Sequence, residues 1–152
     1  MLPIRHKLNR GYSLMELMIT LSILAVLTYL AVPAFSSLIQ ENDLETAKNR
    51  IVNTLQKAKK IANAENTFVD IKIKNNLIEL SPQNSSDSIV VNFPKQISMA
   101  SDISFTFSAT GRPLKPEGET IDTLTNIILS PKSKPSLTET ITVSANGKIA
   151  SL

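Results

Sequence analysis

Gly11-Tyr12-Ser13-Leu14-Met15-Glu16, together with the apolar run that follows it to Phe35, decides the fold of this 152-residue chain. Glu16 is the last charged residue before 19 uncharged ones, Leu17 to Phe35. As a helix with a rise of ~1.5 Å per residue, this run is about 28 Å long, close to the hydrocarbon thickness of a bilayer. A carboxylate in such a segment costs about 2.5–3.5 kcal/mol on insertion scales, so we expect Glu16 to have a function.

Three interpretations of this region are open on its pattern alone. A short basic segment with Arg5, His6, Lys7 and Arg10 precedes the apolar run, as in a secretory signal peptide. In that interpretation the small residues of Val32-Pro33-Ala34 form the cleavage site. The second interpretation is a plain membrane anchor. The third depends on the identity of the residues between Gly11 and Glu16.

These residues resemble the class III prepilin signal of type IV pilin-like proteins: a glycine, an aromatic residue, then Ser-Leu-Met-Glu. In that family a dedicated peptidase cuts after the glycine on the cytoplasmic side and methylates the new amino terminus. The resemblance implies cleavage after Gly11, N-methylation of Tyr12, and an assembly role for Glu16, the fifth residue after the cut. Pro33 matches a proline frequent in these helices. We expect a helix kink at Pro33, because proline removes one backbone hydrogen bond.

The basic leader also accounts for the positive net charge of the chain. The pI of about 9.2 favours nucleic-acid binding at first sight. Three of the 16 basic residues, Arg5, Lys7 and Arg10, lie in the leader, so the cleaved chain has 13 basic and 13 acidic side chains. Positive residues stay on the cytoplasmic side of a membrane. We therefore expect a single-pass protein of the bacterial inner membrane, with its carboxy-terminal part in the periplasm, extractable into a pilus or pseudopilus.

The residue types of the cleaved chain argue against an enzyme. It has no cysteine, and the single histidine, His6, lies in the leader. The common nucleophile–base pairs and His/Cys metal sites are therefore missing, and we expect no catalytic residue, metal or cofactor. Glu117, Glu119 and Asp122 are close enough in sequence for calcium, but a solvated turn is the favoured interpretation. The lack of a disulfide points to the minor-pilin and pseudopilin branches.

After the apolar run the sequence continues as an amphipathic helix. Apolar residues recur at steps of three and four and form one stripe: Leu44, Ala47, Ile51, Leu55, Ala58 and Ala62. Two separate helices are the alternative. We expect four segments: 1–11 a cleaved leader, 12–35 a transmembrane or filament-core helix, 36–64 its amphipathic continuation, and 65–152 a periplasmic β-rich domain.

From residue 67 the pattern changes to period two, which is typical of half-buried strands. We expect strands over 67–73, 77–80, 89–93, 103–108, 125–130, 140–144 and 148–151, with Phe68 among the apolar residues of the first. The predicted fold is α+β and pilin-like: a long N-terminal helix, transmembrane and then amphipathic, packed on antiparallel β-sheets. We recognise no internal repeat.

The carboxy-terminal half also resembles the GspH/FimT branch, through Ala109-Thr110-Gly111-Arg112 after a strand and Asn146-Gly147-Lys148 in the closing hairpin. The resemblance implies a minor pseudopilin of the type II secretion system, a filament tip subunit. Its implied partners are the prepilin peptidase/methyltransferase, the inner-membrane assembly platform, and other pilins or pseudopilins. One alternative is a FimT-like minor type IV pilin for pilus assembly or DNA uptake. Another is a periplasmic binding protein with an ordinary signal peptide.

DNA binding is possible but not favoured by the sequence. The candidate contacts are basic residues of the carboxy-terminal half: Arg112, Lys115, Lys132, Lys134 and Lys148. Phosphate contacts need several clustered cations. The closing hairpin has a single lysine, Lys148, and lacks the paired arginines that DNA-binding members of the branch show there.

Overall fold

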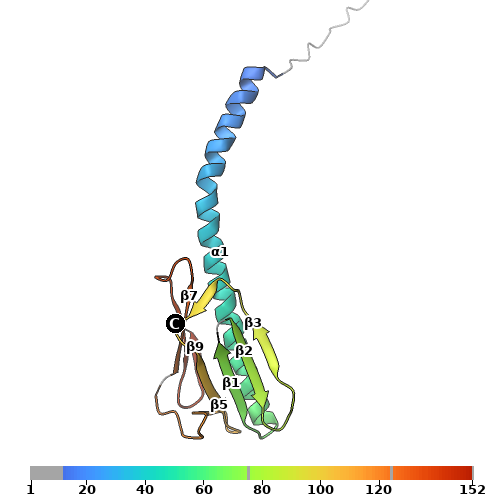
Figure 1. Ribbon diagram of the computed structural model, residues 1–152, viewed down its shortest axis with the longest axis vertical. Helices are drawn as coiled ribbons and strands as arrows, with labels where there is room; N and C mark the ends of the chain where they lie inside the picture. Colours follow the sequence, from blue (N-terminus) through green and yellow to red (C-terminus); the bar gives the residue numbers. More distant parts are fainter. Residues whose placement is uncertain (1–11, 75, 124, 152) are drawn as a thin grey trace, which may run out of the picture. The chain divides into compact units, whose positions relative to one another are not determined.

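The computed structural model describes residues 12–74, 76–123 and 125–151, so the leader and its Gly11 lie outside the described residues. The chain divides into two compact units, one up to Leu38 and one from Ile39 onward. A single helix, α1 (Leu14–Ala64), contributes to both units and is drawn in Figure 1. Each unit is described separately below.

In the first unit α1 is a helix with an exposed, apolar surface. Its amino terminus is capped by Ser13, whose hydroxyl accepts a 3.2 Å hydrogen bond from the amide of Met15. All residues from 12 to 30 are exposed, and the segment is long and apolar enough to cross a membrane by length and composition. The hydroxyls of Thr20, Ser22 and Thr28 donate to carbonyl oxygens of the preceding turn at 2.8 Å. These hydroxyls therefore need no other partner in an apolar environment.

In the second unit α1 provides one side of the hydrophobic core. The predicted stripe is buried as expected: Leu44, Ala47, Ile51, Leu55, Ala58 and Ala62. The helix ends at Ala64. Asn66 then adopts a left-handed conformation, with φ of 48°, and the amide of Thr67 bonds to the carbonyl oxygen of Ala62 at 3.1 Å. This cap turns the chain back along the helix into the first strand.

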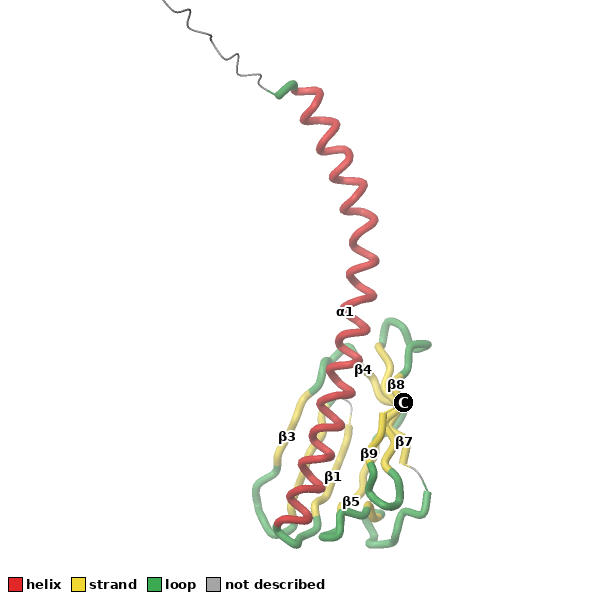
Figure 2. Tube along the Cα trace, turned by 180° about the vertical axis from the view of Figure 1, so that it is seen from behind, coloured by secondary structure: helices red, strands yellow, loops and turns green. Residues whose placement is uncertain are grey.

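Two antiparallel sheets supply the rest of the core. The first has the order β3-β2-β1-β5-β6 and the second β4-β7-β8-β9. The strands of the first sheet are β1 (Val69–Lys74), β2 (Leu77–Pro82), β3 (Ile89–Asn92), β5 (Ile103–Phe107) and β6 (Pro113–Leu114). Those of the second are β4 (Ile97–Met99), β7 (Thr125–Pro131), β8 (Glu139–Val143) and β9 (Ile149–Ser151). Strands β1 and β3 lie along the second half of α1 (Figures 1 and 2). The predicted fold class, one long helix on antiparallel sheets, is confirmed.

The strand predictions differ from the structure in two respects. The described residues form nine strands, and β4 and β6 have no counterpart in the prediction. With three and two residues, they are too short to show an alternating pattern. The assignment of Phe68 was also wrong: its side chain is 44% exposed, whereas Val69 is fully buried. The buried alternation runs through Val69, Ile71 and Ile73, which places Phe68 on the opposite side, with Asp70.

Two turns of the second unit have the same form. The turn Ser108–Arg112, between β5 and β6, has the same form as the turn Ser144–Lys148, between β8 and β9, and both read Ser-Ala-x-Gly-base. In each, the serine amide bonds to the carbonyl of the basic residue, at 2.9 and 3.0 Å, and the glycine amide bonds to the serine carbonyl at 2.7 Å. Gly111 and Gly147 have φ of 75° and 76°. Each sheet therefore contains the same glycine turn.

Candidate functional site

The first turn of α1 contains Glu16, the candidate assembly residue. Ser13 and Glu16 are three residues apart, which is the spacing of a capping box, and Ser13 acts as the N-cap. A carboxylate in the first turn also interacts favourably with the positive end of the helix dipole. Within the described part of the chain Glu16 makes no ion pair. The capping role of Ser13 was missed at the sequence level, although its Ser-x-x-Glu spacing was visible.

Most side chains of α1 around Glu16 are apolar, and all of them are exposed. The large ones, each more than half exposed, include Leu14, Met15, Leu17, Met18, Ile19, Leu21, Ile23 and Leu24. A helix that is apolar all round is stable only in lipid or among other helices. The helix runs without interruption through Pro33, and the kink there stays a prediction. This segment can therefore exchange a lipid environment for a helical one.

Two of the five basic candidates, Arg112 and Lys148, lie in adjoining turns. A Cβ atom at Gly147 would collide with the carbonyl oxygen of Gly111, so the two turns are in direct contact. Lys59 of α1 lies beside them, and its Nζ donates a 2.8 Å hydrogen bond to the carbonyl oxygen of Gly147. Arg112 and Lys148 are both exposed. The structure thus places these two exposed residues in adjoining turns.

The remaining basic candidates lie elsewhere in the second unit. Lys132 and Lys134 belong to the loop between β7 and β8. Glu139, the first residue of β8 after this loop, pairs with Lys48 of α1 at 3.3 Å. Lys48 precedes Lys59 by 11 residues, about 16 Å along the helix axis. The basic residues of the two regions therefore do not form one patch.

Lys115 forms an ion pair with an acidic residue, Glu119. Its Nζ lies 2.8 Å from the Glu119 carboxylate. This hydrogen bond and the opposite charge raise the pKa of Lys115 and lower the pKa of Glu119. The same contact argues against calcium binding by Glu117, Glu119 and Asp122, because Glu119 is already paired with Lys115. In residues 12–151, as far as they are described, no group of three acidic side chains is arranged to hold a metal ion.

A cleft of about 250 Å³ opens beside the paired turns. Arg112 and Asn146 contribute to its wall, and so does the carboxylate residue Asp122. A phosphate group in this cleft would meet a negative charge as well as a positive one. The cleft is therefore less suited to a nucleic-acid backbone than the two exposed cations alone would be.

Comparison with known proteins agrees with this arrangement. The prokaryotic N-terminal methylation motif matches residues 6–29. Two crystal structures of FimU from Pseudomonas aeruginosa strain PAO1, described as a type IV minor pilin, have the same fold, with TM-scores of 0.56 and 0.55. The chain is type IV pilin-like. Sequence identity to FimU is 16% and 17%, and the alignments cover 72% of this chain and 88% and 92% of the FimU chains. No curated protein matches the sequence.

The methylation motif and the likeness in fold support different conclusions. At this level of identity the likeness to FimU shows the fold alone. The methylation motif implies processing by a prepilin peptidase and assembly with other pilins, and it covers the segment that contains Tyr12 and Glu16. Motif and fold together indicate a structural subunit with an apolar amino-terminal anchor and a carboxy-terminal domain.

Proposed function

We propose that the chain is a minor subunit of a type IV pilin-like filament. In this proposal it is cleaved after Gly11, held in the inner membrane by residues 12–35, and folded in the periplasm from residue 36 onward. The observation that carries the proposal is the exposed apolar surface of α1, which begins within the methylation motif. This surface suits lipid before assembly and neighbouring helices afterwards.

In this proposal Glu16 sets the position at which each subunit docks on its neighbour. Cleavage exposes a cationic amine on Tyr12, and Glu16 of one subunit pairs with the amine of its neighbour. An unpaired carboxylate within an apolar bundle is costly, and breaking a buried ion pair costs about 3–5 kcal/mol. A subunit in the wrong register would leave both charges unpaired, so the pair penalises incorrect docking.

Two filaments are candidates. The sequence resemblance to the GspH/FimT branch favours the pseudopilus of type II secretion, with the chain at or near its tip. The likeness in fold to FimU supports a minor subunit of a type IV pilus as the second candidate. For a pilus with DNA uptake, the adjoining positions of Arg112 and Lys148 supply two of the cations needed.

A deletion strain separates the two filaments. Loss of secreted enzymes with normal pili and transformation supports the pseudopilus, whereas loss of pili or transformation with normal secretion supports the pilus. Normal behaviour in all three assays contradicts both. A gel shift of DNA by the detergent-solubilised chain at physiological salt tests the uptake role.

The binding-protein alternative predicts a different mature amino terminus. An ordinary signal peptide cut at Val32-Pro33-Ala34 would give a chain that begins at Phe35. Helix α1 is continuous through these residues, so a cut there would divide it. The proposed cut after Gly11 leaves α1 intact. Sequencing the mature amino terminus decides between Tyr12 and Phe35.

A further inference from the structure

The uncharged run of α1, Leu17 to Phe35, contains four hydroxyl groups, and one of them has no partner within the described residues. Thr20, Ser22 and Thr28 donate to carbonyl oxygens of their own helix at 2.8 Å. The phenol of Tyr29 makes no hydrogen bond to any described residue, and its side chain is 80% exposed. The short side chains of serine and threonine reach carbonyls of the preceding turn, whereas a phenol oxygen is held away from the backbone by its ring.

Pro33 leaves a second group without its usual partner at the same position. In an α-helix the amide of residue 33 donates to the carbonyl oxygen of residue 29. Proline has no amide hydrogen, so the carbonyl of Tyr29 loses this donor, although α1 continues through Pro33. Tyr29 therefore has a donor in its side chain and an acceptor in its backbone for which α1 supplies no ordinary partner.

The phenol of Tyr29 lies in the apolar middle of α1. Long side chains of a helix point toward its amino terminus, so the phenol lies over the turn around Val26. Val26 is the middle residue of the uncharged run, with nine residues on either side. At ~1.5 Å per residue, both ends of the run are about 14 Å away. The phenol is therefore too deep to reach the headgroup level, where tyrosine ordinarily anchors a membrane helix.

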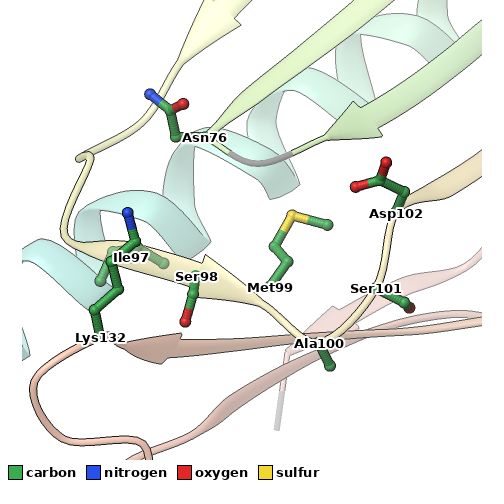
Figure 3. Close-up of a pocket in the computed structure, with 8 residues that line it drawn as sticks. All are labelled: Asn76, Ile97, Ser98, Met99, Ala100, Ser101, Asp102 and Lys132. Carbon is green, nitrogen blue, oxygen red and sulfur yellow. The ribbon is translucent and has the colours of Figure 1, made fainter.

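Polar side chains of the second unit have water as a partner. Figure 3 shows Asp102 and Lys132 at the wall of a pocket of about 290 Å³. Both residues are exposed, so water can solvate their charges. The core of a bilayer contains no water, and an unpaired phenol there is destabilising. Tyr29 therefore needs a partner from another molecule.

We propose that the phenol of Tyr29 donates a hydrogen bond to an acceptor oxygen on the apolar helix of a neighbouring pilin-like subunit. The inference rests on the proposed function, because it takes its partner from the same filament. Hydrogen bonds between helices are effective in an apolar environment, where the apolar surfaces themselves supply no hydrophobic attraction. Glu16 lies 13 residues earlier, about 20 Å along the helix. Two points of attachment fix both the position and the rotation of the helix, whereas one fixes only its position.

Removing the phenol oxygen tests the proposal with the full chain in the native bacterium. Tyr29→Phe keeps the ring, so it should accumulate in the membrane at the native level. Its incorporation into sheared filaments should fall about threefold to tenfold, which is the range expected for one hydrogen bond between membrane helices. The matched control is Thr28→Val, whose lost hydroxyl donates only to Leu24 of its own helix. It should assemble normally.

Two results of this comparison would overturn the proposal. Native incorporation of Tyr29→Phe would show that the phenol contributes nothing to docking. A Tyr29→Phe chain that fails to accumulate in the membrane would show that the phenol serves insertion instead.

Photocrosslinking identifies the molecule that the ring contacts. p-Azidophenylalanine replaces Tyr29, and Ala25, four residues earlier on the same face, is a second position that keeps the phenol. In filaments we expect adducts with the apolar helix of a pilin-like subunit, mapped by mass spectrometry. Adducts with lipid alone, or no adduct from either position, would refute the contact.

The native chain separates the two levels of inference. If it is present in filaments and Tyr29→Phe is equally abundant there, the filament function stands and the hydrogen bond is refuted. If the native chain is present in no pilin-like filament, the proposed function and the hydrogen bond fail together.

Discussion

The Nζ of Lys59 donates a 2.8 Å hydrogen bond to the carbonyl oxygen of Gly147, which joins α1 to the turn after β8. Gly111 in the matching turn of the other sheet lies against the same lysine, since a Cβ atom there would be 2.7 Å from Lys59 Cε. Helix and both sheets therefore meet at one point. Both glycines have a positive φ, and at Gly147 a Cβ atom would also collide with the backbone of Gly111.

Replacing Gly147 by alanine tests this junction. Alanine at φ of 76° costs about 1–2 kcal/mol in backbone strain, and the clash with the Gly111 carbonyl adds about 1–3 kcal/mol. The matched control is Gly118→Ala, where φ is 86° but nothing lies within 4 Å of the new Cβ. Urea unfolding of the detergent-solubilised chain should show a larger loss for Gly147→Ala. Equal losses would mean that the turns do not press on each other.

Lys59→Met tests the hydrogen bond without removing the stem of the side chain. It leaves the Gly147 carbonyl without its donor, so we expect a loss of about 1–3 kcal/mol in the free energy of unfolding. Lys60→Met, at an exposed neighbouring position, should change it by less than about 0.5 kcal/mol. The same unfolding measurement applies, and a neutral Lys59→Met would show that the bond contributes nothing.

The sequence predicts the helix and most strands because their burial follows simple periods. Leu44, Ile51 and Leu55 recur at helical spacing, and Ile103, Phe105 and Phe107 alternate. The contacts that the sequence does not predict join residues that lie far apart in the chain. Nothing in the spacing of Gly111 and Gly147 indicates that the turns touch, because that contact depends on how two sheets pack.

The candidate site shows the same division between local and tertiary information. The motif around Glu16 is a local signal, and the family comparison finds it. The grouping of basic residues is tertiary: Arg112 lies near Lys148, while Lys132 lies in another loop. Strand β4 is not predicted from the sequence either, because three residues are too few to show an alternating pattern.

The Lys115–Glu119 pair predicts the titration of a surface group. Because the hydrogen bond from Lys115 lowers the pKa of Glu119, the contribution of Glu119 to stability exists above its ordinary pKa and is lost as pH falls through the lowered value. The raised pKa of Lys115 acts in the opposite sense, and its contribution is lost only as pH rises through that raised value. NMR titration should find Glu119 below its ordinary value of 4.5 and shifted back toward it in Lys115→Gln. An unchanged titration in that variant would contradict the pairing. Both groups are exposed, so the effect on stability is small.

Processing depends on the residue before the cut. We expect Gly11→Ser, or a bulkier replacement, to block cleavage, because the class of signal that this region resembles has glycine at the cleavage point. Mass spectrometry of the membrane fraction should find the leader still attached. The control is Ser36→Ala, downstream of the motif, which should be cleaved normally. A Gly11→Ser chain that begins at Tyr12 would show that the glycine is not needed.

Glu16 gives the sharpest test of assembly. We expect Glu16→Val to insert into the membrane at least as well as the native chain, because it removes a charge from an apolar segment. Incorporation into filaments should be lost, because the Tyr12 amine of the neighbour then remains unpaired, at a cost of about 3–5 kcal/mol if it is buried. Glu41→Val, which removes an exposed acid of the same helix, is the matched control and should assemble normally. Membrane fractionation and immunoblots of sheared filaments measure the two steps separately. Filaments that contain Glu16→Val at the native level would show that this carboxylate does not direct docking.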